Sequence, residues 1–106
     1  MHHALHARAC IERGRSWQAE FWIMVIRYHA LQLACERRGL DADYGRDFDK
    51  LPPEVREASV DAMVRSMDPA ELRRALGAAV ALLLQESAEV RDVADEVEPL
   101  LRELTL

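Results

Sequence analysis

The spacing of the apolar residues constrains this 106-residue chain more than any other feature. Along nearly the whole sequence they recur at intervals of three and four, and the two-residue alternation of a half-buried strand is missing. This pattern predicts an all-α fold, an up-and-down bundle of four or five helices that forms a single domain over residues 1–106. A chain of this length buries a core without needing disulfide or metal staples.

Breaks in the periodicity predict where the helices begin and end. Five helices are expected. The first three cover about residues 2–13, 17–38 and 53–66, the fourth starts at Pro69 and includes Leu84, and the fifth includes Val90 to Leu104. Gly14 and Gly39 end the first two, because glycine readily adopts the conformation found just past a helix end. The link around Gly14 is so short that the first two helices should form an antiparallel hairpin. Pro99 predicts a kink or a restart within the fifth.

Capping and core residues follow from the same boundaries. Ser16 is expected as the N-cap of the second helix. Asp68, followed by Pro69 and then Glu71, predicts the start of the fourth. The second helix is apolar nearly all round, which is typical of the buried centre of a bundle. The core residues expected from the third and fourth helices are Val60, Met63, Val64, Met67, Leu72, Leu76, Val80, Leu83 and Leu84.

Composition narrows the class of protein. Hydrophobic residues make up 50% and charged residues 31%, as in a globular domain. The net charge of −5 disfavours nucleic acid as a partner and favours cationic ligands. The longest apolar run, residues 21–26, is far shorter than a membrane span, and no secretory signal precedes it, so no membrane association is expected. Cys10 and Cys35 are expected to be buried reduced thiols, which indicates a cytoplasmic protein.

Glu20 is the strongest candidate for a functional residue. It lies inside the apolar stretch of the second helix, where a carboxylate is costly to bury without a partner. Arg27 follows seven residues later and should lie on the same face, two helical turns away. One interpretation is that Glu20 lines a polar pocket, where it meets a cationic ligand or acts as a base. The other is that it marks a solvent-exposed stripe or is tied structurally to an arginine.

Other candidate residues carry weaker signals. His2 and His6 have the spacing of a metal-binding pair, but they lie at a terminus without further ligands nearby, so no metal site is expected. The aspartates of residues 39–52 fit neither a calcium loop nor a DxD metal site, and turn or capping roles are expected for them. The RNase motif of HEPN domains has an arginine several residues before its histidine, and the corresponding positions before His29 are Trp22, Ile23 and Met24. This activity is therefore not expected, and His29 is expected at an interior or boundary position.

Part of the sequence resembles a known family of helical domains. The specific part is Arg13-Gly14-Arg15-Ser16-Trp17-Gln18-Ala19-Glu20-Phe21-Trp22-Ile23, and it continues weakly through Arg37-Arg38-Gly39-Leu40, Tyr44-Gly45-Arg46 and Ser66-Met67-Asp68-Pro69-Ala70-Glu71-Leu72. These residues resemble the C-terminal helical substrate-binding domain of aminoglycoside-type, kanamycin nucleotidyltransferase-like enzymes, a bundle related to HEPN domains.

The resemblance implies a function shared between two domains. A catalytic nucleotidyltransferase domain or subunit would bind the nucleotide and Mg²⁺, and this bundle would hold neither. The bundle would line the site of a small hydroxylated, possibly cationic acceptor, with Glu20, Trp17 and Arg27 as substrate-binding residues and no catalytic residue of its own. Because Met1 begins at the first expected helix, the chain is expected to be either a fragment or a separate subunit.

A second class of function remains open. The chain could be a helical protein-interaction or antitoxin-like module without a small-molecule substrate, and it could form a homodimer. Exposed tryptophan and leucine side chains in a stripe would favour this interpretation, because large apolar patches mark interfaces. A concave polar pocket around Glu20 would favour the substrate-binding domain.

Overall fold

The computed structural model describes residues 2–87, which form four α-helices and two short 3-10 turns without any strand. The bounds of these elements are α1 His2–Glu12, α2 Ser16–Arg37, η1 Asp43–Gly45, η2 Phe48–Lys50, α3 Pro53–Asp61 and α4 Pro69–Glu86. The expected all-α class is therefore confirmed. The fifth expected helix, residues 90–104, lies outside the described residues.

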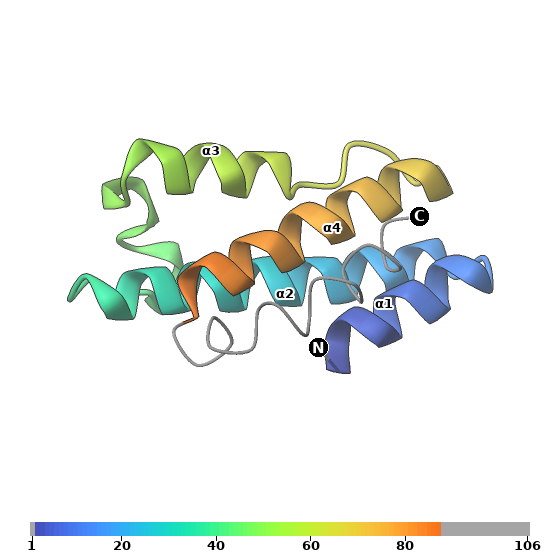
Figure 1. The fold of residues 1–106 in the computed structure, drawn as a ribbon, viewed down its shortest axis with the longest axis horizontal. Helices are drawn as coiled ribbons and strands as arrows, with labels where there is room; N and C mark the ends of the chain where they lie inside the picture. Colours follow the sequence, from blue (N-terminus) through green and yellow to red (C-terminus); the bar gives the residue numbers. More distant parts are fainter. Residues whose placement is uncertain (1, 88–106) are drawn as a thin grey trace.

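Consecutive helices run in opposite directions, so that α2 and α4 point the same way (Figure 1). These two helices pack side by side along much of their length, α1 lies against both, and α3 lies mainly against α4. The expected antiparallel hairpin of α1 and α2 is present. Gly14, with a φ of +74°, turns the chain, and the Arg15 amide donates to the Cys10 carbonyl at 2.8 Å.

The core consists of two clusters arranged along α2. The first joins α1, the first half of α2 and most of α4, and its buried members are Ala4, Ala7, Cys10, Ile11, Ala19, Ile23, Ile26, Ala62, Leu72, Ala75, Leu76, Ala79 and Val80. The second joins the other half of α2 to the start of α3 and the last turns of α4, with Ala30, Leu31, Ala34, Cys35, Leu51, Val55 and Leu82. Leu83 is partly buried and packs against both clusters. The many alanines allow close approach of the helices.

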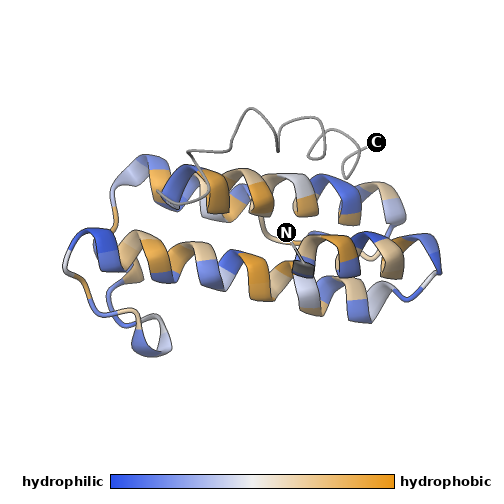
Figure 2. Cartoon of the chain, turned by 60° about the horizontal axis from the view of Figure 1, so that its bottom comes forward, coloured by the Kyte–Doolittle hydropathy of each residue, from blue (hydrophilic) through white to orange (hydrophobic). Residues whose placement is uncertain are grey.

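The expectation that α2 is buried all round is wrong for one of its faces. Trp17 is 78% exposed, and Phe21, Met24 and Tyr28 are between 38% and 48% exposed. Apolar residues recur along the whole of α2 (Figure 2), but α1, α3 and α4 cover only part of its circumference. A helix 22 residues long therefore keeps an uncovered apolar face among the described residues.

The boundaries of α3 differ from those expected. The helix ends at Asp61 instead of Ser66, and both Val60 and Met63, expected in the core, are at least half exposed. The carbonyls at its end accept hydrogen bonds from two arginines on other helices. Arg27 donates to Ala62 at 3.2 Å, and Arg74 donates to Asp61 at 2.6 Å and to Met63 at 2.9 Å. Val64 and Met67 pack against the first cluster as expected.

The expected helix starts are confirmed more closely than the expected caps. Ser16 is the first residue of α2 instead of its N-cap, which is Arg15, and no side chain caps the helix. α4 begins at Pro69 as expected, with Asp68 as the N-cap residue. The Glu71 carboxylate accepts from the Arg65 amide at 2.9 Å, so it reaches back beyond Asp68 to tie down the α3–α4 link. None of the helices in residues 2–87 combines the length and hydropathy that a membrane crossing requires.

Candidate functional site

The uncovered face of α2 carries four apolar side chains in a line, which we call the α2 stripe: Trp17, Phe21, Met24 and Tyr28. Their spacing of four, three and four residues keeps them on one face over three helical turns. At the C-terminal end of the stripe the Tyr28 ring meets Phe48 of η2 edge to face, at a centroid distance of 5.8 Å. The Phe21 ring meets that of Trp22, the next residue of the same helix, at 5.2 Å.

Glu20 and Arg27 lie on the same side of the α2 stripe, as their spacing predicts. Both are half-buried, and no described side chain donates a hydrogen bond to the Glu20 carboxylate. Burial lowers the pKa of the Arg27 guanidinium, and the negative charge of Glu20 partly offsets that effect. One Arg27 nitrogen is engaged by the Ala62 carbonyl, which leaves further donors of the guanidinium for a ligand or a neighbouring protein.

Trp17, Glu20 and Arg27 line neither of the two cavities described below. Trp17 lies at the N-terminal end of the α2 stripe and is largely exposed, while Arg27 lies nearly three turns further along the helix. The three residues share a surface, on which the Trp17 ring is exposed and the Glu20 carboxylate and the Arg27 guanidinium are half-buried. This arrangement offers one wall of a binding site, with both charges at its edge.

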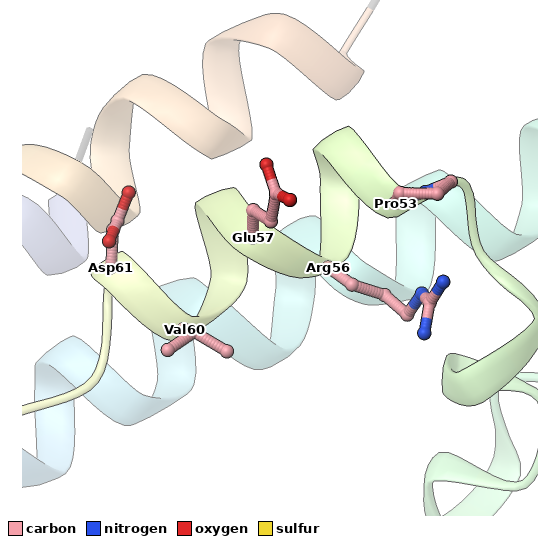
Figure 3. A pocket seen from close by; sticks show the side chains of 5 residues that line it. All are labelled: Pro53, Arg56, Glu57, Val60 and Asp61. Atoms are coloured by element: carbon pink, nitrogen blue, oxygen red, sulfur yellow. The ribbon is translucent and has the colours of Figure 1, made fainter.

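One cavity of about 350 Å³ lies elsewhere, along the outward face of α3. Pro53, Arg56, Glu57, Val60 and Asp61 line it, and in Figure 3 Val60 points away from Glu57 and Asp61. Arg56 donates to the Leu51 carbonyl at 3.0 Å and so holds the turn before α3. The carboxylates and the arginine do not converge on a common point, and this cavity presents no catalytic arrangement.

A second cavity of about 200 Å³ lies at the α1–α2 hairpin. Its lining residues are His6, Ala9, Cys10, Arg13, Arg15, Gln18 and Trp22. The Trp22 ring stacks on His3 at 4.9 Å and meets the edge of His6 at 5.3 Å, so histidines flank the indole. Glu20 lines neither cavity. Neither of these two cavities therefore provides the concave polar pocket around Glu20 that would favour a complete substrate site.

The other residues that the sequence singled out are the loop aspartates and His29. Two aspartates hold the loop before α3 in place. The Asp41 carboxylate accepts a hydrogen bond from the Asp43 amide at 2.9 Å, and the Asp47 carboxylate accepts one from the Asp41 amide at 2.7 Å. The expected turn roles are thus confirmed for these two. His29 is exposed on α2, which contradicts an interior or boundary position. Within residues 2–87, no three His, Cys, Asp or Glu side chains gather as a metal site would require.

One buried charge has its partners in the fold. Glu86 is 2% exposed at the end of α4, and its carboxylate pairs with Arg38 at 2.6 Å and with Arg37 at 3.4 Å. The same Arg38 nitrogen also donates to the Ala34 carbonyl at 2.8 Å. These contacts join the C-terminal ends of α2 and α4, and a carboxylate satisfied in this way has a structural role.

The sequence identified Glu20 and Arg27 but not the surface to which they belong. Trp17, Phe21 and Met24 are among the apolar residues of the helix expected at the buried centre, although their spacing with Tyr28 carries the signal of a continuous seam. Comparison of the chain with protein-family models, curated proteins and solved structures finds no match. Residues 2–87 thus form an all-α bundle of four helices, with an open apolar face on the second of them.

Proposed function

We propose that this bundle is the non-catalytic, substrate-binding helical domain of a nucleotidyltransferase system, and that the α2 stripe with Glu20 and Arg27 forms one wall of the acceptor site. The observation that carries the proposal is the exposed Trp17 ring on the same face as the Glu20 carboxylate. An aromatic face and a carboxylate together attract a hydroxylated cation, through ring contacts and charge. The stretch around Trp17 to Glu20 is also the part of the sequence that most resembles such domains.

The open shape of this face fits a divided function. A wall without an opposite side becomes a cleft only when a second body closes it. We assign that role to a separate catalytic nucleotidyltransferase domain, which binds the nucleotide and Mg²⁺ and supplies the chemistry. Cys10 and Cys35 are both buried and unpaired, which suits a reducing compartment such as the cytoplasm.

Thermal unfolding with and without a panel of aminoglycosides tests this proposal. A ligand that binds only the folded state raises the unfolding midpoint, and at ten times its Kd it stabilises the fold by about 1.4 kcal/mol. We expect a raised midpoint for the wild-type chain and a much smaller rise for Glu20→Gln. Glu36→Gln is the matched control, because Glu36 is also a carboxylate on α2, is exposed and lies off the α2 stripe.

Two results would contradict the proposal. If no aminoglycoside moves the wild-type midpoint even at millimolar concentration, the face is not an acceptor wall. If Glu20→Gln retains the full ligand-induced rise that Glu36→Gln shows, Glu20 does not contact the acceptor.

A second candidate function is a helical protein-interaction or antitoxin-like module without a small-molecule substrate. The observation that favours it is the α2 stripe itself, since four aligned apolar side chains are typical of a surface that binds another protein. A protein partner that protects Trp17 from solvent and is insensitive to aminoglycosides would identify this function.

A further inference from the structure

The α2 stripe has the register of a helix–helix seam. Residues spaced by four, three and four occupy alternating d and a positions of a heptad, so that Trp17 and Met24 take d while Phe21 and Tyr28 take a. In the described part of the molecule no other helix occupies this seam, and Trp17 remains 78% exposed. A seam of this kind is suited to one partner helix lying along α2.

The α2 stripe is complementary to itself when two copies run antiparallel. With a two-fold axis midway between Trp22 and Ile23, Trp17 meets the partner's Tyr28, and Phe21 meets the partner's Met24. Each layer then joins a d position to an a position, as antiparallel helix pairs require. The same axis serves both layers, because both pairs are centred on the same point of the helix.

The charged residues beside the α2 stripe, Glu20 and Arg27, also favour the antiparallel pair. Glu20 and Arg27 each precede an a position by one residue, so both occupy g positions on one side of the seam. In an antiparallel pair the g positions lie on the same side of the interface, and with the axis defined above the partner's Arg27 is the g position nearest to Glu20, offset from it by two residues along the helix. A parallel pair would instead place Glu20 opposite the partner's Val25 and Arg27 opposite the partner's Gln32, without any charge pairing.

We propose that the α2 stripe binds a second copy of this chain, as an antiparallel two-fold pair of α2 helices with two symmetric Glu20–Arg27 contacts. A two-fold interface uses the same patch on both subunits, which this face provides in shape and in charge. The inference goes beyond the proposed function, because a second copy covers the face that would otherwise contact an acceptor. The self-pair and the acceptor-bound form therefore exclude each other.

Charge reversal at Glu20 and Arg27 tests whether a second copy binds the α2 stripe and whether the two helices pair in the proposed register. Sedimentation equilibrium of the full chain should show a reversible dimer. Glu20→Arg alone places two arginines face to face, and Arg27→Glu alone places two glutamates face to face, so each variant should dimerise about tenfold more weakly or worse. Mixing the two variants restores opposite charges at both contacts, and the mixture should dimerise as tightly as the wild type. The double exchange within one chain should do so as well.

The mixture separates the proposal from a folding defect, since two misfolded chains would not rescue each other. Glu36→Arg, the same change of charge away from the stripe, should leave the dimer intact, while Phe21→Asp should abolish it in every background. A wild-type chain that stays monomeric at hundreds of micromolar would overturn the inference, and so would a dimer indifferent to both charge reversals. Neither result would affect the aminoglycoside-dependent midpoint that tests the proposed function.

Discussion

At the scale of the residue, the Glu71 carboxylate accepts hydrogen bonds from two sides. Arg74 donates to it from Nε at 2.6 Å and from a terminal nitrogen at 2.7 Å, and the Arg65 amide donates at 2.9 Å. These bonds, that of the Arg74 side chain above all, lower the pKa of Glu71 from 4.5 to about 2. One side chain thus links the start of α4 to the segment that follows α3.

The sign of this pKa shift predicts how stability changes in acid. The folded pKa of Glu71 lies below its unfolded value, so its contribution is fully present above about pH 4.5 and is lost as the pH falls towards 2. Replacing Glu71 by Gln should lower the free energy of unfolding at pH 7, and the difference from wild type should shrink steadily between pH 5 and pH 2. Urea unfolding at several pH values measures it. A difference that stays constant with pH would show that the ionised carboxylate contributes nothing.

The sequence predicts some residue positions and not others, for physical reasons. That Glu20 and Arg27 share a face follows from helix geometry alone, since seven residues make almost two turns. That Trp17 is exposed does not follow, because an apolar helix is buried only where neighbours happen to pack. The local pattern reports which residues suit a core, and the tertiary arrangement decides which of them enter it.

At the scale of the element, α3 depends on its neighbours for its end. Arg27 on α2 and Arg74 on α4 donate to carbonyls of residues 61–63, so the last turn of α3 is held by side chains from two other helices. The apolar residues up to Met67 continue the helical period, which is why a longer helix was expected. Donors 35 and 13 residues away along the chain end it at Asp61, and no local pattern could reveal them.

Removing Arg74 should loosen α3 selectively. Arg74→Met keeps much of the side-chain volume but removes the hydrogen bonds to Asp61, Met63 and Glu71, and should cost about 1–3 kcal/mol of stability. The amides at the end of α3 should exchange with solvent faster than those in the middle of α2. Arg73→Met, the neighbouring residue, serves as control. Equal exchange in both variants would show that Arg74 does not anchor α3.

At the scale of the whole molecule, the fold class and the α1–α2 hairpin could be predicted, while the neighbour relations could not. Periodicity specifies that each helix has an apolar face, and a link of about three residues forces α1 and α2 to be antiparallel. The close packing of α2 on α4, which run in the same direction, depends on long-range matching of alanines and leucines. The open face of α2 is a consequence of that choice of neighbours.

Leu83, the residue shared by the two core clusters, also bears on how the molecule comes apart. If Leu83 couples the two core clusters, the native state unfolds as one cooperative unit. Truncating the Leu83 side chain should then let the two clusters unfold separately. The two buried thiols report on each half, since Cys10 lies in the first cluster and Cys35 in the second. In Leu83→Ala, destabilised by about 2 kcal/mol, the labelling rates of the two thiols should diverge.

Leu84→Ala is the matched control, because Leu84 packs only against the first cluster and should leave the two thiols with rates that change in proportion. Labelling rates that stay proportional in Leu83→Ala would mean that the coupling runs through the α2 backbone instead. Rates that diverge in Leu83→Ala but not in Leu84→Ala would mark this one leucine of α4 as the boundary between two kinetic halves, one with the hairpin and most of α4 and the other with the end of α2 and the start of α3.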